Sequence, residues 1–148
     1  MILVVGSTGY LGSEICRRLT AAGKDVRALV RETSDPEKVA RLKSFGVQTV
    51  IGDLREPASL TAACQGVETL ISTANTVSSR QPGDSIPVTD QQGQLDLVQA
   101  ARGAGVGHFI LISIAREAAP CPLTTAKRSV EKAMIDSGMA YTILCASE

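Results

Sequence analysis

The chain has 148 residues, the length of a single globular domain that can bury roughly 70% of its unfolded surface. Its 15 basic and 15 acidic residues cancel, so the sequence lacks the basic excess of nucleic-acid and membrane-surface binders. Aromatic residues make up only 3% of the chain, which argues against a stacking platform for single-stranded nucleic acid. We therefore expect neither a nucleic-acid partner nor a membrane.

Apolar runs and cysteines argue against membrane, secreted and metal-binding classes. No apolar run approaches the ~20 residues of a membrane-spanning helix. The opening run lacks a charged region and meets Gly6 too early for the apolar core of a signal peptide. The four cysteines form no Cys-x-x-Cys pair and His108 is the only histidine, so we expect no metal site. These features predict reduced thiols and a cytoplasmic location.

Six short runs rich in Val, Ile and Leu predict β-strands. They are apolar at consecutive positions, which indicates strands that are covered on both faces, as in a parallel sheet. The predicted strands are Ile2–Val5, Val26–Val30, Val47–Ile51, Thr69–Ser72, Phe109–Ser113 and Tyr141–Leu144.

Helical spacing and capping residues predict helices between these strands. The first helix ends at Gly23, the second begins at Asp35-Pro36, and a short third helix begins at Pro57. The apolar face of the first helix consists of Leu11, Ile15, Leu19 and Ala22.

Two later helices carry their own signals. The segment 89–92 (TDQQ) fits a capping box, and the last helix ends at Gly138. The buried stripes behind these signals are Leu95, Val98 and Ala101 in the first, and Ala126, Val130, Ala133 and Met134 in the second. Strands that alternate with helices predict an α/β fold, a doubly wound parallel sheet with helices on both faces, in one domain over residues 1–148. The long irregular stretch Ala74–Val88 is either functional or disordered.

The turn after the first predicted strand carries the strongest functional signal. Its glycines lie three apart, at a point where the chain leaves a strand and enters a helix. A dinucleotide pyrophosphate needs this arrangement, because backbone without Cβ atoms can approach it and offer N–H groups at a helix N-terminus. A tight turn without a ligand is the alternative. The residues of the turn are Gly6, Ser7, Thr8, Gly9, Tyr10, Leu11 and Gly12.

These residues resemble a known family. STGYLG after ILVV, with AGVGHFILIS over 104–113 and SGMAYTIL over 137–144, resembles the atypical short-chain dehydrogenases/reductases of the NmrA-like and isoflavone-reductase-like branch. Gly52-Asp53-Leu54 continues the resemblance, which covers nearly the whole chain. It implies a Rossmann domain with about six strands in the order 3-2-1-4-5-6, a bound NAD(P) cofactor and oxidoreductase chemistry.

The residue that ends the second strand predicts NADP(H) rather than NAD(H). An NAD site usually has an acidic residue there, whereas Arg31 matches a ribose 2′-phosphate. In the resembling reductases a lysine shortly after this arginine joins it, and Lys38 is the nearest match. The alternatives are a solvated surface arginine and an ordinary exposed lysine.

Further cofactor contacts follow the third and fourth strands. By resemblance, Asp53 and Leu54 lie against the adenine, although Asp53 could instead cap the helix that begins at Pro57. Thr73, Ala74 and Asn75 correspond to the backbone that passes the ribose and nicotinamide in the family.

The catalytic position departs from the superfamily's Tyr-x-x-x-Lys pattern. Leu123 stands at the tyrosine position, and Lys127 matches the lysine. The isoflavone-reductase-like enzymes also lack this tyrosine, so the resemblance implies that Lys127 acts as the acid/base or binds the nicotinamide ribose. An exposed helix lysine is the alternative. In the superfamily, the hydroxyl that polarises a substrate carbonyl lies just after the fifth strand, and Ser113, the last residue of that predicted strand, is the candidate.

In the resembling family an Arg-Pro, which reads Cys145-Ala146 here, leads into a small substrate-covering region, whereas these residues stop at Glu148. We expect either a fragment or a reduced form that lacks most of the substrate pocket. We therefore expect slow turnover unless a partner or a second copy, as in a homodimer, covers the site.

The sequence leaves two candidate functions. One is an NADP(H)-dependent reductase of a small organic substrate, and the other is a catalytically silent dinucleotide sensor that acts through a protein partner. A receiver-type signalling domain would need an acidic pair where Gly6 and Ser7 stand, and a methyltransferase would want an acid at Arg31.

Overall fold

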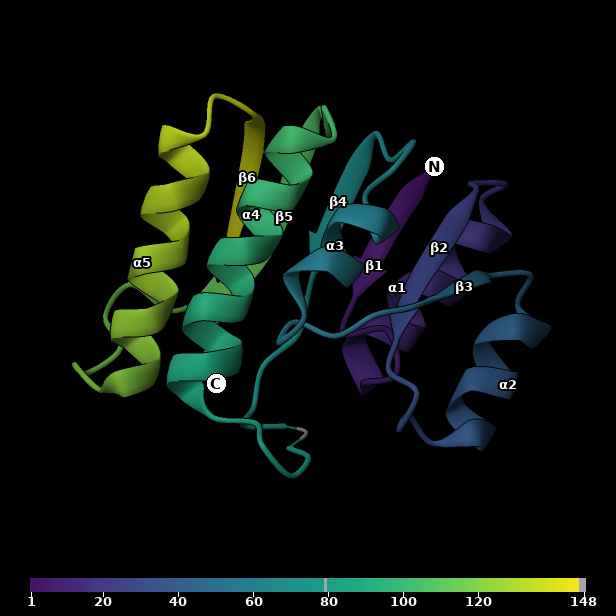
Figure 1. Ribbon diagram of the computed structural model, residues 1–148, viewed down its shortest axis with the longest axis horizontal. Helices are drawn as coiled ribbons and strands as arrows, with labels where there is room; N and C mark the ends of the chain where they lie inside the picture. Colours follow the sequence, from purple (N-terminus) through teal and green to yellow (C-terminus); the bar gives the residue numbers. More distant parts are fainter. Residues whose placement is uncertain (79, 147–148) are drawn as a thin grey trace.

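All six predicted strands form one parallel sheet in the computed structural model, which describes residues 1–78 and 80–146 (Figure 1). The strand order is β3-β2-β1-β4-β5-β6, so the predicted doubly wound Rossmann topology is confirmed. The strands are β1 (Ile2–Val5), β2 (Val26–Val30), β3 (Gln48–Ile51), β4 (Thr69–Ser72), β5 (His108–Ile114) and β6 (Ala140–Ala146).

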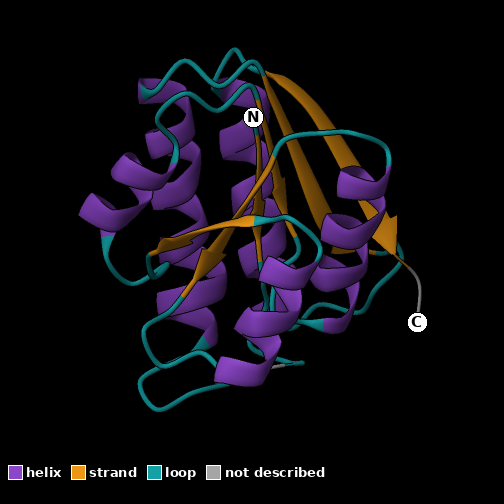
Figure 2. Ribbon diagram, turned by 90° about the vertical axis from the view of Figure 1, so that its right-hand side faces the viewer, coloured by secondary structure: helices purple, strands orange, loops and turns teal. Residues whose placement is uncertain are grey.

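Helices cover the two faces of the sheet unequally. In Figure 1, α3, α4 and α5 lie in front of the sheet and α1 lies behind it, and Figure 2 shows the same layers from the side. Over the described residues, none of these helices is long and apolar enough to cross a membrane. The helices are α1 (Tyr10–Ala21), α2 (Pro36–Ser44), α3 (Pro57–Ala63), the π-helix η1 (Ile86–Gly93), α4 (Gln94–Gly103) and α5 (Pro122–Asp136).

The core divides into two clusters, one on each face of the sheet. Successive side chains of a strand point to opposite faces. Leu3 of β1 therefore packs with Leu97 and Val130 on the α4 and α5 side, whereas Val4 packs with Cys16 on the α1 side. Both Leu3 and Val4 are fully buried, which confirms for β1 the prediction that consecutive apolar residues indicate cover on both faces.

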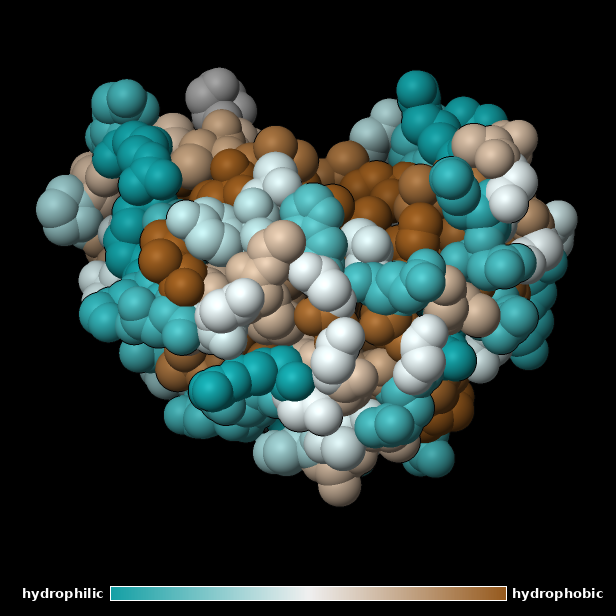
Figure 3. All heavy atoms as spheres, turned by 90° about the horizontal axis from the view of Figure 1, so that it is seen from above, coloured by the Kyte–Doolittle hydropathy of each residue, from teal (hydrophilic) through white to brown (hydrophobic). Residues whose placement is uncertain are grey.

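This prediction is wrong for the two strands at the edges of the sheet. Ile51 of β3 and Leu144 of β6 keep 55% and 49% of their surface exposed. On β5, Phe109 and Leu111 are buried against α4 and α5, while Ile110 and its alternating neighbours are only half-buried. The cause is that helices cover the two faces of the sheet unevenly. In the cluster packed under α1 and α2, the strand residues come only from β1 and β2. Seen from above, apolar side chains line a hollow between two more polar lobes (Figure 3).

Two helices differ from their predicted form. On α1 the buried residues are Gly12 and Cys16, and the predicted core residue Leu11 is 45% exposed. The predicted capping box at 89–92 is wrong, because the helical segment already begins with η1, where Ser85 accepts a hydrogen bond from the Val88 N–H. On α4, Leu97 is fully buried and Leu95 is only partly buried.

The packing of β5 predicts a large loss of stability for Phe109→Ala. Phe109 is fully buried, so its truncation should lower the free energy of unfolding by about 3–5 kcal/mol. Tyr141, its register partner on the exposed strand β6, is the matched control, and Tyr141→Ala should cost about 1 kcal/mol or less. Urea unfolding of both variants measures the difference, and equal losses would contradict this description of the core.

Candidate functional site

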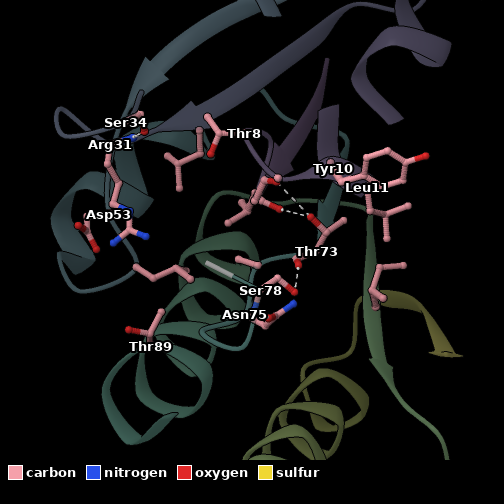
Figure 4. Close-up of a pocket in the computed structure, with 18 of the residues that line it drawn as sticks. Thr8, Tyr10, Leu11, Arg31, Ser34, Asp53, Thr73, Asn75, Ser78 and Thr89 are labelled. Atoms are coloured by element: carbon pink, nitrogen blue, oxygen red, sulfur yellow. Dashed lines mark hydrogen bonds between the residues drawn. The ribbon is translucent and has the colours of Figure 1, made fainter. Parts of the chain in front are cut away.

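A cavity of about 340 Å³ opens at the carboxyl ends of the central strands (Figure 4). In doubly wound sheets, ligands bind at this edge, near the point where the strand order reverses. The structure brings most of the predicted cofactor-binding residues together around this cavity. Those that line it are Gly6, Thr8, Gly9, Tyr10, Leu11, Gly12, Arg31, Asp53, Leu54, Thr73, Ala74 and Asn75.

The glycine turn depends on two close backbone approaches. Gly6 has a φ of +85°, and a Cβ atom there would lie 2.5 Å from Thr73 Oγ1 and 2.7 Å from the Ala74 nitrogen. A Cβ atom on Gly12 would lie 2.2 Å from the carbonyl oxygen of Gly6. Because these neighbours are mostly backbone, neither glycine can be replaced without a shift of the turn. The turn therefore fixes how α1 begins against β1 and β4.

The N-terminus of α1 faces the cavity, where the Gly9 N–H donates to the Gly6 carbonyl at 3.1 Å and the N–H groups of the following first turn point out of the helix. Gly9 is its N-cap residue, and within the described chain no side chain caps this end of the helix. The N–H groups of the first turn have no partner inside a helix, and the helix dipole makes this end electropositive. Since Gly9, Tyr10 and Leu11 line the cavity, this end is suited to hold a diphosphate group.

The end of β4 is tied to the end of β1 by Thr73. Its N–H donates to the carbonyl of Val5 at 2.9 Å, and its hydroxyl reaches the Val5 and Gly6 carbonyls at 3.2 and 3.3 Å. Asn75 stabilises the following turn, since its Oδ1 accepts hydrogen bonds from the N–H groups of Val77 and Ser78. These contacts hold the backbone of 73–75 along one wall of the cavity.

Arg31 lies at the opposite wall, where β2 ends. Its Nη1 donates to both carboxylate oxygens of Asp84, at 3.1 and 2.9 Å, although Asp84 lies 53 residues further along the chain. The backbone N–H of Arg31 donates to Ser34 Oγ at 2.9 Å, and Ser34 also lines the cavity. A guanidinium and a hydroxyl therefore stand together at this wall.

Asp53 is held by Arg55 rather than capping α3. Its carboxylate accepts hydrogen bonds from the backbone N–H, Nε and Nη2 of Arg55, at 2.9, 3.0 and 2.7 Å. Burial acts to raise the pKa of Asp53, but the hydrogen bonds from Arg55 outweigh it, so the pKa lies below its ordinary value. The N-cap residue of α3 is Glu56, so the alternative that Asp53 caps this helix is wrong.

Lys127 is buried on α5, with 6% of its surface exposed. Its Nζ donates to the carbonyl of Ile112 at 3.2 Å, and Ile112 lines the cavity although Lys127 itself does not. Burial lowers the pKa of Lys127 below its ordinary value, while the nearby carboxylates of Asp90 and Glu131 act in the opposite direction. The alternative of an ordinary exposed helix lysine does not fit this burial.

Ser113 points away from the cavity, toward α5. Its hydroxyl donates a hydrogen bond to Glu131, which also pairs with Arg128 at 2.6 Å. Phe109, Leu111 and Ser113 are every second residue of β5, and all three face its buried side. The structure therefore places Ser113 in a buried polar network under α5 and does not bring it to the cavity wall.

Two further predicted residues lie outside the cavity wall. Ser7 is fully buried and donates to the Leu29 carbonyl at 2.8 Å, so it supports the turn from behind. Lys38 is exposed on α2 and is not among the lining residues. Of the predicted loop Ala74–Val88, Ser79 lies outside the described residues, and η1 already forms the end of the loop.

Sequence reasoning missed several polar residues of the site. Ser34, Ser78 and Thr89 line the cavity, and Asp84 and Arg55 hold its charged wall. Ser34 carried a usable signal, because a hydroxyl in the turn after the second strand lies close to any phosphate at Arg31. For Asp84 there was no such signal, because its partner is distant in the sequence.

Comparison with known proteins identifies the family. The family model described as NmrA-like family matches residues 1–147. The chain belongs to the NmrA-like family. The resemblance found in its glycine turn and later motifs is thereby confirmed.

Curated relatives have different described roles. The chain is 36% identical over 146 residues to the photosystem II assembly factor Ycf39 of Cyanophora paradoxa, covering 96% of this chain and 43% of that protein. It is 37% identical over 148 residues to an NAD(P)H azoreductase of Xenophilus azovorans, covering 97% of this chain and 46% of that protein. The chain thus spans about half the length of the curated relatives it matches.

A solved structure shares the fold over nearly the whole chain. The Citrobacter sp. triphenylmethane reductase complexed with NADP(H) matches with a TM-score of 0.79 and 28% sequence identity. The match covers 98% of this chain and 49% of that protein. A relative with this architecture therefore binds NADP(H).

The glycine turn predicts that Gly12→Ala and Gly9→Ala differ in stability. The added Cβ of Gly12→Ala meets backbone at 2.2 Å, whereas that of Gly9→Ala meets its nearest atom at 3.3 Å. Gly12→Ala should lower the free energy of unfolding by about 3 kcal/mol or more, and Gly9→Ala by about 1 kcal/mol or less. Thermal and urea unfolding compare them. A Gly12→Ala protein as stable as the parent would refute the close approach.

Proposed function

We propose that this chain is an NADP(H)-binding domain of an NmrA-like reductase that transfers hydride to a small organic substrate. The observation that carries the proposal is the cavity at the carboxyl ends of the strands, where the glycine turn, Arg31 and Asp53 converge. The NADP(H) complex of the triphenylmethane reductase and the name of the azoreductase support it.

The residues around the cavity fit a 2′-phosphorylated dinucleotide. Gly6–Gly12 provides backbone donors at the N-terminus of α1 for the diphosphate. Arg31 and Ser34 provide a guanidinium and a hydroxyl for the 2′-phosphate, and Leu54 an apolar contact for the adenine. NAD(H), with a hydroxyl in place of that phosphate, would use fewer of these groups.

The bound cofactor supplies the hydride, and the chain supplies positioning and a proton. The backbone at Thr73–Asn75 and Ile112 forms the walls of the inner end of the cavity. In this proposal the Lys127 ammonium lies behind Ile112 and either donates a proton to the reduced substrate or binds the nicotinamide ribose. The lowered pKa of Lys127 favours proton donation, because its ammonium group is a stronger acid than that of a solvated lysine.

A regulatory role through a protein partner is the second candidate. The similarity to a photosystem II assembly factor supports it, as does the buried Ser113 hydroxyl, which leaves no hydroxyl from that position at the cavity. In this case dinucleotide binding would control contact with another protein. The protein partner, a homodimer and the cytoplasmic location stay predictions.

Cofactor titration with Arg31→Ala tests the proposed function. The unchanged protein should bind NADPH more tightly than NADH, and saturating NADPH at a hundred times its Kd should stabilise the fold by about 2.7 kcal/mol. Arg31→Ala should weaken NADPH binding about tenfold or more and leave NADH binding within a few-fold, because it removes the charge-assisted contact. Nicotinamide fluorescence and thermal shifts measure both. Absence of binding to either cofactor would overturn the proposal.

Lys127→Met separates the two roles of the buried lysine. If Lys127 provides the proton, the variant should lose turnover of an azo or quinone test substrate by about a hundredfold or more, with NADPH affinity within a few-fold. If Lys127 binds the ribose, NADPH affinity and rate should fall together. Parallel measurements of kcat and Kd distinguish these results, and unchanged values of both would remove Lys127 from the site.

A further inference from the structure

The carboxylate of Asp84 is buried beside the wall proposed to receive the 2′-phosphate. Its side chain is 0% exposed and pairs with Arg31 at 2.9 Å and with Arg55 at 3.7 Å. Two neutral donors complete its surroundings, the Gln81 N–H at 2.9 Å and the Thr89 hydroxyl at 3.2 Å. Nothing in the proposed chemistry uses this carboxylate, although it contacts the arginine that selects the cofactor.

The charges of this wall balance one another. Arg31 and Arg55 contribute two guanidinium groups, and Asp53 and Asp84 contribute two carboxylates, all joined by ion pairs. Burial acts to raise the pKa of Asp84, but hydrogen bonds from Gln81 and Arg31 outweigh it, and the pKa lies below its ordinary value. Asp84 is therefore charged at neutral pH, and the cluster has no net charge with which to attract a phosphate dianion.

We propose that Asp84 is a specificity-determining residue that limits the preference of this site for NADP(H) over NAD(H). The inference rests on the proposed function and adds to it. A carboxylate in contact with Arg31 repels a phosphate that approaches the same guanidinium, and burial of the Asp84 side chain strengthens this repulsion. The ribose hydroxyl of NAD(H) carries no charge, so Asp84 opposes NADP(H) selectively.

The surrounding segment is anchored by contacts that do not involve Asp84. Gln81 contacts Thr33 through its side chain, and the Pro82 carbonyl accepts a hydrogen bond from Arg55 Nη1 at 2.9 Å. These bonds hold the segment 81–84 against the turns after β2 and β3. A variant that removes the Asp84 charge should therefore leave the segment 81–84 in place, so the effect of the charge can be measured separately from that of a loosened segment.

Asp84→Asn is the direct test, with Gln81→Ala as its matched control. Asp84→Asn removes one negative charge and preserves the size of the side chain, so the ratio of the NADH Kd to the NADPH Kd should rise about tenfold. Gln81→Ala removes the contact with Thr33 and changes no charge, so its ratio should stay within about twofold of the unchanged protein. Titration by nicotinamide fluorescence measures both ratios.

Each other result of this titration counts against the inference. A ratio that is unchanged or lower in Asp84→Asn would mean that Asp84 only positions Arg31. An equal rise in Gln81→Ala would assign the effect to loosening of the segment. If the unchanged protein bound neither dinucleotide, the proposed function would fail and the inference with it, a result distinct from binding with an unmoved ratio.

Two further measurements protect the test from a variant that fails to fold. Asp84→Ser removes the same charge and retains a hydroxyl that can accept a hydrogen bond from Arg31, and its ratio should also rise. In the unchanged protein, adenosine 2′,5′-bisphosphate should bind less than about tenfold more tightly than adenosine 5′-monophosphate, because the cluster is neutral. A difference of a hundredfold or more would overturn the inference without any variant.

Discussion

The close approach of backbone at Gly6 is the constraint on which the cavity depends. The chain turns there with a positive φ, with Gly12 against the Gly6 carbonyl and Thr73 against its Cα. β1 lies between β2 and β4 in the sheet, so this turn stands where the chain order of the strands reverses. α1 continues from it on one face, while the chain after β4 continues toward the other. The cavity lies between the start of α1 and the chain that follows β4.

Charged side chains from three separate loops close one end of this cavity. Arg31 follows β2, Asp53 and Arg55 follow β3, and Asp84 precedes η1. A buried carboxylate is stable only when its partners stay in place, so each of these groups fixes the position of the others. The result is a wall whose charged side chains are held by their own ion pairs. In our proposal, this balanced charge makes cofactor choice depend on the ion pairs between these groups and not on Arg31 alone.

The inner end of the cavity depends on the alternation of side chains along β5. Ser113 belongs to the residues that face α5, so its hydroxyl is held by Glu131 within the protein. Ile112 points the other way and lines the cavity, and its carbonyl accepts the hydrogen bond from Lys127. Lys127 thus stands near the cavity without a serine or tyrosine beside it. Proton donation by the Lys127 ammonium therefore belongs to the proposed function, and the buried Ser113 hydroxyl takes no part in it.

The sequence by itself determined the features that act over a few residues. Glycine spacing predicted the turn at Gly6, the Asp35-Pro36 pair predicted the start of α2, and apolar runs predicted the strands, because their causes are local backbone sterics and hydrogen bonding. Most of the residues predicted to bind the cofactor line one cavity, since the carboxyl ends of parallel strands share one edge. Only the tertiary structure decided that β6 is an exposed edge, that Ser113 faces α5 and that Arg31 pairs with Asp84. These outcomes depend on contacts between distant segments, such as the 53 residues that separate Arg31 from Asp84, and no local pattern encodes them.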